Sequence, residues 1–210
     1  MPQTQLLITA GPTHEPIDEV RYLANRSSGR LGVAIADAAA RRGWRVTMLL
    51  GPTHLSVSDT NVDLHRFRTA ADLEALLREH APHCDLLIMA AAVADYRPAA
   101  RSAGKIERTD QALTVTLEPV PDLIAACARA KRPHQRFVGF ALAAREGLEA
   151  AARAKMARKG LDGIVANPLE TMDAETVEAI LIAGEAVART QGPVSKAAFA
   201  EWLLDRLESP

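Results

Sequence analysis

The stretch best suited to chemistry is residues 21–32, Arg-Tyr-Leu-Ala-Asn-Arg-Ser-Ser-Gly-Arg-Leu-Gly. It lies downstream of a buried-looking strand and is expected to open a helix. Ser27, Ser28 and Gly29 would then offer hydroxyls, free backbone N–H groups and the positive end of the helix dipole, which together suit a phosphate. Asn25 precedes them with an amide that can serve a reacting carbonyl or phosphoryl oxygen. The competing interpretation is structural: a serine caps the helix, and Gly29 lets two backbones pack closely.

A second group of residues follows an apolar run and reads Ala90-Ala-Ala-Val-Ala-Asp-Tyr-Arg-Pro98. Small residues such as Ala91 let a ligand lie directly on the backbone. Asp95 could accept hydrogen bonds from a sugar or a base, or could hold a metal ion. Its structural alternative is an aspartate that caps a turn before Pro98.

Three further features carry weaker signals. Lys105 lies in an expected flap, where an ammonium could be brought over a transferring phosphoryl group, although a lone lysine is more often simply solvated. Phe140 ends an expected strand and could stack on a base or fill the core. Lys155 and Lys159 are four residues apart on one helical face, from which both could reach a triphosphate.

The elements that must position these side chains alternate between short β-like runs and longer helical ones. Continuous apolar runs such as Leu86-Leu-Ile-Met-Ala90 are typical of parallel strands that are covered on both faces. The sequence therefore predicts a doubly wound, Rossmann-like parallel α/β sheet with its ligand at the carboxyl ends of the strands. The expected strands are Leu6–Thr9, Arg45–Leu50, Asp63–Phe67, Leu86–Ala90, Arg136–Phe140 and Gly163–Ala166, and the expected helices are 28–42, 70–80, 121–130, 146–159 and 195–207. Ser195 is expected to cap the last helix, and Gly160 to end the one before it in the left-handed conformation.

Two segments interrupt this alternation. Residues 104–118, within a flap at about 99–119, alternate apolar and polar side chains at Leu113–Leu117, which predicts a hairpin or flap. Residues 177–190 predict a second hairpin, with strands Val177–Ile182 and Val187–Arg189. The extra strands could extend the main sheet, form a small sheet of their own, or pair with a second subunit through an exposed edge.

Length and composition limit the classes of protein to which this chain could belong. At 210 residues the chain is expected to be one domain, 1–210, and its net charge of −1 without runs of like charge argues against nucleic-acid and membrane partners. Cys84 and Cys127 lack metal-ligand spacing and are expected to be free thiols in a reducing cytoplasm. Met1–Thr4 leads directly into a strand, so no leader is expected, and no apolar run reaches the ~20 residues of a membrane span.

The familiar phosphate loops are absent from the sequence. The first strand leads into Gly11-Pro-Thr-His-Glu-Pro-Ile-Asp18, which contains no G-x-G-x-x-G, and no G-x-x-x-x-G-K-[ST] occurs anywhere. The spacing Tyr-x-x-x-Lys is missing too, since Tyr22 is followed by Arg26 and Tyr96 by Ala100. These absences disfavour a nicotinamide-dependent oxidoreductase, which stays open as an alternative.

Taken in order, the motifs resemble those of the phosphopantothenoylcysteine synthetase family of coenzyme A biosynthesis. The matching segments span the whole chain in the family's order, and together they are specific where each alone is not. They are Thr9–Asp18, Val20–Gly32, Ala90–Pro98, Lys105-Ile106, Val138–Ala141 and Lys159–Asn167.

The resemblance implies a cytoplasmic ligase that activates the carboxylate of 4′-phosphopantothenate with CTP and Mg²⁺. Pyrophosphate leaves, and cysteine attacks the acyl-cytidylate to release CMP. On this basis Lys105 would neutralise charge on the α-phosphate and Asn25 would handle the acyl-cytidylate. Which residues would bind the metal ion is unknown.

The resemblance also implies binding roles and a homodimer whose sites are completed by the neighbouring subunit. Gly11 would belong to the nucleotide site, Ala91 and Asp95 would contact the nucleoside, and Phe140 would pack on its base. Residues 27–29 would seat a phosphate, and Lys155 and Lys159 would add charge around the triphosphate. The exposed hairpin suits dimerisation. No attached decarboxylase domain is expected, so a separate decarboxylase partner would consume the product.

The chain departs from the family pattern at several positions. The flap reads Lys105-Ile-Glu-Arg108 where Lys-x-Lys-Lys is usual, Leu142-Ala-Ala144 follows Gly-Phe-Ala where Glu-Thr is common, and Arg30 replaces a lysine. These changes leave three alternatives open beside the CTP-dependent ligase: the same ligation with ATP, an oxidoreductase on a similar fold, and a non-catalytic nucleotide-binding module.

Overall fold

The computed structural model describes residues 3–172 and 174–208. Met1 and Pro2, which carry part of the expectation about a leader, and Asp173 lie outside the described residues. The helices are α1 (Arg30–Arg41), α2 (Ala70–His80), α3 (Leu123–Arg129), α4 (Leu148–Lys159) and α5 (Lys196–Glu208), with short 3-10 turns at Ala81–His83 and Leu169–Thr171. The strands are β1 (Gln5–Ala10), β2 (His14–Pro16), β3 (Tyr22–Ala24), β4 (Arg45–Leu50), β5 (Asp63–Arg66), β6 (Leu86–Met89), β7 (Tyr96–Pro98), β8 (Leu117–Pro119), β9 (Arg136–Ala143), β10 (Gly163–Pro168), β11 (Thr176–Val177), β12 (Ile180–Ala183), β13 (Ala186–Arg189) and β14 (Val194–Ser195).

The central sheet has eight strands in the order β13-β12-β10-β9-β6-β1-β4-β5. Its strands from β10 to β5 pair in parallel, so the predicted doubly wound sheet is confirmed. The chain leaves β1 toward β4 and β5, then returns to the other side of β1 with β6, β9 and β10. This reversal places a topological switch point between β1 and β6, where such sheets bind ligands beyond the carboxyl ends of their strands.

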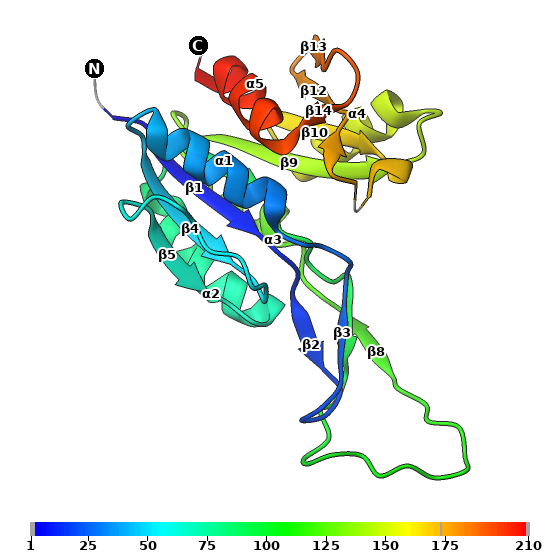
Figure 1. Ribbon diagram of the computed structural model, residues 1–210. Helices are drawn as coiled ribbons and strands as arrows, with labels where there is room; N and C mark the ends of the chain where they lie inside the picture. The colour runs from blue at the N-terminus through cyan, green and yellow to red at the C-terminus, as the bar shows by residue number, and fades with distance from the viewer. Residues whose placement is uncertain (1–2, 173, 209–210) are drawn as a thin grey trace.

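Helices cover both faces of the sheet (Figure 1). Alternate strand residues point to opposite sides, so Ile8 and Met48 pack beneath α1 and α5, while Leu7 and Leu49 pack beneath α2 and α3. A third cluster joins α4 to β9, β10 and β12. This burial on both faces explains why the strands read as continuous apolar runs. None of the helices in the described part of the chain has the length and apolar content that a bilayer crossing requires.

The helix ends agree with the sequence at two sites and differ at one. Gly160 ends α4 with a φ of 67°, and the Ser195 hydroxyl accepts a hydrogen bond from the Ala198 N–H of α5, as predicted. The expected helix at 28–42 begins later, at Arg30. Its N-cap is Gly29 with a φ of 75°, so neither Ser27 nor Ser28 is the N-cap residue. The Ser28 hydroxyl still accepts a hydrogen bond of 3.5 Å from the Arg30 N–H at the start of the helix.

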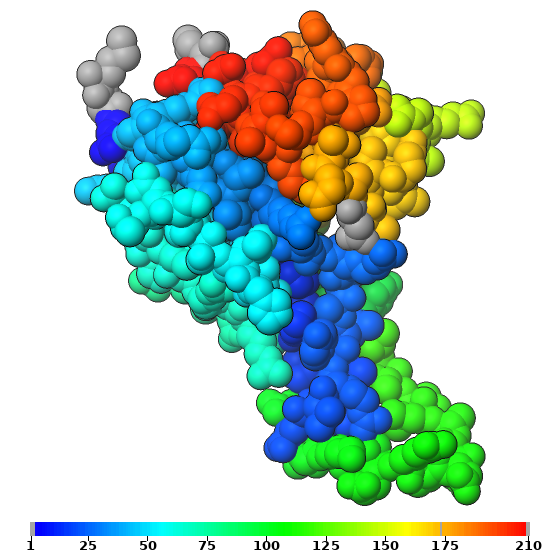
Figure 2. All heavy atoms as spheres, in the orientation of Figure 1, coloured from blue at the N-terminus to red at the C-terminus, as the bar shows by residue number. Residues whose placement is uncertain are grey.

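An arm, residues 14–24 and 96–119, projects from the carboxyl end of the sheet (Figures 1 and 2). It is built from two ribbons, β2 with β3 and β7 with β8. Of the hairpin or flap predicted for 104–118, the hairpin is wrong, because Leu117–Pro119 is a strand that pairs with Tyr96–Pro98 and the residues between these two strands form a long loop. The apolar side chains of the alternation at 113–117 include two that are exposed, Leu113 at 56% and Leu117 at 44%.

The C-terminal hairpin extends the main sheet, which is one of the three arrangements considered. β12 pairs antiparallel with β10 and β13 lies outside it as the sheet edge. The single strand expected at Val177–Ile182 is broken in two, because Thr176–Val177 pairs instead with Val194–Ser195 in front of α5. Whether the β13 edge contacts a second subunit stays a prediction.

Candidate functional site

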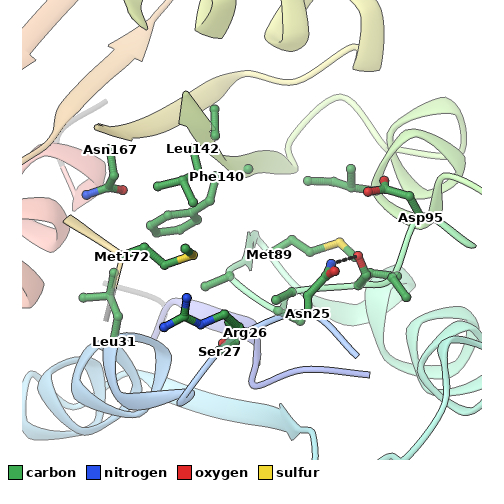
Figure 3. Close-up of a pocket in the computed structure, with 18 of the residues that line it drawn as sticks. Asn25, Arg26, Ser27, Leu31, Met89, Asp95, Phe140, Leu142, Asn167 and Met172 are labelled. Carbon is green, nitrogen blue, oxygen red and sulfur yellow. Dashed lines mark hydrogen bonds between the residues drawn. The ribbon is translucent and has the colours of Figure 1, made fainter. Parts of the chain in front are cut away.

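A cavity of about 1070 Å³ lies at the switch point, where side chains from segments far apart in sequence converge (Figure 3). Its walls come from the loop before α1, the segment after β6, the entry to α3, the end of β9, one face of α4 and the segment after β10. Six of the predicted site residues line the cavity: Asn25, Ser27, Ser28, Ala91, Asp95 and Phe140. Lys155 and Lys159 line it as well.

Two buried threonines shape the wall formed by the segment after β6. The Thr9 hydroxyl accepts a hydrogen bond from the Ala91 N–H at 3.1 Å, and the Thr13 hydroxyl accepts one from the Ala94 N–H at 3.0 Å. Both threonines are fully buried. Because side chains hold these backbone groups in place, the small residues at 90–94 present a fixed backbone surface to the cavity.

Asn25 lies in the middle of the cavity (Figure 3) and is oriented by this same segment. Its amide nitrogen donates to the Val93 carbonyl at 2.8 Å. The hydrogen bond ties the loop before α1 to the segment after β6, across the switch point. The amide is thereby held facing the space in which a ligand would lie.

One end of the cavity gathers charged side chains from α4 and the entry to α3. The Lys159 ammonium lies 2.8 Å from the Asp122 carboxylate, which also caps α3 by accepting from the Ala125 N–H. Burial lowers the pKa of Lys155 and the charge of Lys159 lowers it further, while the carboxylates of Asp122 and Asp95 oppose the shift. A half-buried ammonium beside a second cation is stabilised by an incoming polyanion, so this end suits a triphosphate.

The central part of the cavity is apolar. Figure 3 shows the Phe140 ring facing Met172, with Leu31 of α1 on the far side of Met172. Leu142 and Met172 are 45% and 39% exposed. Exposed apolar side chains inside a cavity offer surface to the uncharged part of a ligand.

The other end of the cavity lies against the N-terminus of α1. Ser27, Ser28 and Arg30 line it, and Lys196 of α5 lines the cavity as well. The Lys196 ammonium donates to the Ala174 carbonyl in the segment after β10. Hydroxyls and cations at a helix N-terminus form an environment that favours an anion.

Three of the predicted site residues, Gly11, Gly29 and Lys105, are not among the residues that line the cavity. Gly11 and Gly29 pack against each other, and a β-carbon added at Gly29 would lie 3.3 Å from the Gly11 nitrogen. The close-packing interpretation of Gly29 is therefore confirmed. Lys105 is an exposed residue of the arm, on the loop between β7 and β8 that projects from the body (Figure 1), and it is not among the residues that line the cavity of its own chain.

Sequence reasoning missed several residues that shape the site. Asp122 meets Lys159 only through the packing of α3 against α4, and Lys196 enters from the last helix. The contributions of Thr9 and Thr13 depend on strand pairing. The one signal that could have found a member of this set is the Pro121-Asp122 sequence before an apolar run, which is typical of a helix N-cap.

The fold and the cavity define a Rossmann-like protein with an elongated polar–apolar–polar site at its switch point. Within the described residues no group of three histidine, cysteine, aspartate or glutamate side chains could hold a metal ion by itself. The arrangement can bind a ligand with anionic groups at both ends and can place a carbonyl or phosphoryl centre beside Asn25.

Comparisons with known proteins agree with this class. The family model described as "DNA/pantothenate metabolism flavoprotein C-terminal domain" matches residues 1–209. A curated relative from an unknown prokaryotic organism, named cysteine/cysteine sulfinic acid decarboxylase, is 42% identical over 166 residues, 79% of this chain and 46% of its own length. The coenzyme A biosynthesis bifunctional protein CoaBC of Vibrio cholerae is 43% identical over 168 residues, 78% of this chain and 41% of its own. The solved C-terminal domain of a CoaBC protein has a TM-score of 0.83 at 30% identity, covering 98% of this chain and 94% of that one.

The chain belongs to the DNA/pantothenate metabolism flavoprotein C-terminal domain family, and its resemblance to phosphopantothenoylcysteine synthetases is confirmed. It spans less than half the length of these curated relatives.

Proposed function

We propose that the protein is a phosphopantothenate–cysteine ligase. The observation that carries the proposal is the cavity at the switch point, which places Asn25 between a cationic end on α4 and an anion-favouring end on α1. The family membership and the CoaBC relatives support it. An acid that carries a phosphate at its far end, joined transiently to a nucleotide, would match this sequence of polar, apolar and polar surfaces.

The reaction has two steps. An oxygen of the substrate carboxylate attacks the α-phosphorus of the nucleotide, and the bond to the β-phosphate breaks to release pyrophosphate. The amine of cysteine then attacks the acyl carbon and loses a proton, and the bond to the phosphate oxygen breaks to release the nucleoside monophosphate. In this scheme the Asn25 amide hydrogen-bonds the reacting carbonyl region, a type of interaction that stabilises charge as it develops.

CTP is the proposed nucleotide, with ATP as the competing choice. Lys155 and Lys159 would attract the triphosphate, and binding would exchange the Asp122 partner of Lys159 for phosphate. Asp95 would accept hydrogen bonds from the sugar, and Phe140 offers a ring face for the base. Leu142-Ala-Ala144 follows Gly-Phe-Ala141 where the family commonly has a Glu-Thr pair, so the choice between CTP and ATP is the part of the proposal that most needs measurement.

Magnesium is proposed as a companion of the triphosphate. Mg²⁺ in nucleotide sites is usually held by substrate phosphates with one or two carboxylates. Asp95 and Asp122 both line the nucleotide end of the cavity and fit that limited role. The ion would neutralise phosphate charge, and the side chains of this chain would orient the nucleotide.

A homodimer is proposed to bring Lys105 to the chemistry. Lys105 lies on the projecting arm, so a second copy could receive it where its own cavity does not. The exposed apolar side chains of the arm, which include Val20, Tyr22, Tyr96 and Leu117, support an interface there.

The proposal is tested by incubating the purified protein with 4′-phosphopantothenate, cysteine, Mg²⁺ and CTP, and then analysing the products by mass spectrometry. The proposal expects a mass equal to phosphopantothenate plus cysteine minus water, formed together with CMP. Formation of the adduct without nucleotide consumption, or nucleotide hydrolysis without the adduct, would contradict it. In a separate incubation with a nicotinamide cofactor, a change in its absorbance would instead favour the oxidoreductase alternative.

A further inference from the structure

An ion pair crosses the rim of the cavity at the N-terminus of α1. The Arg30 guanidinium lies 2.7 Å from the Glu175 carboxylate, which belongs to the segment between β10 and β11. Arg30 lines the cavity beside Ser27 and Ser28. Glu175 is thus placed next to the end of the cavity at which an anionic group of a ligand would lie.

The electrostatics of α1 explain why a carboxylate from elsewhere lies there. The first turn of the helix, Arg30-Leu-Gly-Val33, contains no acid and begins with a cation. A cation at this end opposes the helix dipole, which favours negative charge near the first turn. Glu175 supplies that negative charge from another segment, and in this respect it does what a ligand phosphate would do.

The position of Glu175 does not depend on Arg30 alone. The neighbouring Ala174 carbonyl accepts a hydrogen bond from Lys196, and the following residues pair with β14 as strand β11. The ion pair itself is weakly shielded from water, since the side chains of Arg30 and Glu175 are 52% and 83% exposed. Such a pair is easily exchanged for another anion.

On the basis of the proposed function, we propose that Glu175 is an internal competitor for the phosphate of the acid substrate. It occupies Arg30 while the cavity is empty and is displaced when the phosphate binds. Glu175 thereby sets how tightly the acid binds and takes no part in the covalent steps.

The test compares Glu175→Gln with Glu170→Gln as a matched control. Glu170 lies five residues earlier and pairs with Arg145, and neither of those two residues lines the cavity. Binding of 4′-phosphopantothenate is measured by calorimetry without nucleotide. Because an exposed ion pair contributes little free energy, we expect Glu175→Gln to lower the dissociation constant only roughly twofold to fivefold. Glu170→Gln should leave the dissociation constant unchanged.

A double-mutant cycle sharpens the test. In an Arg30→Gln background the substitution Glu175→Gln should no longer tighten binding, because the guanidinium for which Glu175 and the phosphate compete is absent. Unchanged or weaker binding in Glu175→Gln, an equal shift in both glutamate variants, or a full effect without Arg30 would overturn the proposal.

Turnover separates this inference from the proposed function. If the wild-type protein releases pyrophosphate and the affinities do not follow the pattern, only the role of Glu175 fails. If the affinities follow the pattern and no ligation occurs, the competing carboxylate stands and the proposed reaction fails.

Discussion

In the proposed reaction, Asn25 is the residue on which the chemical step depends most. Its amide is held at the Val93 carbonyl and faces the cavity. We predict that Asn25→Ala lowers the overall rate by ~100–1,000-fold, the typical cost of removing one donor that stabilises a transition state. The exchange of labelled pyrophosphate into CTP should survive, because activation precedes the step that Asn25 serves. An unchanged overall rate would show that Asn25 is not part of the reaction centre.

Lys155 gives a prediction about pH. Burial and Lys159 lower the pKa of its ammonium in the free protein, and a bound triphosphate would stabilise the charged form and raise that pKa. Binding should therefore take up a proton at pH values between the two pKa values, and nucleotide affinity should fall as the pH rises through the pKa of the free protein. Calorimetry in buffers of different ionisation enthalpy measures this uptake. Lys155→Met should abolish it, and buffer-independent heats for the wild type would contradict the prediction.

At the scale of elements, Asp18 fastens the turn between β2 and β3 to the long loop of the arm. This carboxylate is buried and accepts hydrogen bonds from the backbone N–H groups of Val20, Arg21 and Ile106 and from the Arg21 side chain. Burial alone would raise the pKa of Asp18, but these donors together hold it well below its ordinary value. The ribbon β2–β3 is thereby tied to the loop that carries Lys105.

We predict that Asp18→Asn loosens the loop at 99–116 while leaving the sheet folded, because the amide nitrogen of asparagine cannot accept the hydrogen bonds of the lost oxygen. Limited proteolysis should cut that loop severalfold faster in the variant. The depressed pKa means that the stabilisation is present above the ordinary pKa of aspartate and is lost as the pH falls toward the lower folded value. The wild-type loop should therefore become more susceptible in acid, and the variant should lack that dependence. Equal cleavage of both proteins at neutral pH would rule out this anchoring role.

The parallel sheet could be predicted from sequence because burial on both faces forces each strand into a continuous apolar run. The arm could not, since its strands are three residues long and are fixed by contacts such as Asp18 with Ile106, which lie 88 residues apart. The same distinction applies to the site. Asn25 and Asp95 could be identified as site residues from their local sequence motifs. Asp122 and Lys196 reach the cavity only because separate helices pack together.

At the scale of the whole molecule, the arm raises the question of which cavity Lys105 serves. It projects from the body (Figure 2), and several of its apolar side chains are exposed. If it completes the site of a second copy, a mixed dimer of Asn25→Ala and Lys105→Gln subunits contains one site with both residues intact. Differently tagged subunits allow that dimer to be purified, and it should show about half the wild-type activity, whereas each parent variant is nearly inactive. Activity as low as that of the parent variants, or a monomer in sedimentation experiments, would contradict the idea that Lys105 of one subunit completes the site of the other.

The central claim is tested most directly by pyrophosphate release from the purified protein, measured with CTP and with ATP in the presence of Mg²⁺ and cysteine. We predict release with CTP that requires 4′-phosphopantothenate and fails when that acid is omitted. Release with ATP alone would support the proposed ligation but contradict CTP as its nucleotide. No acid-dependent release with either nucleotide would contradict the assignment of this protein as a ligase.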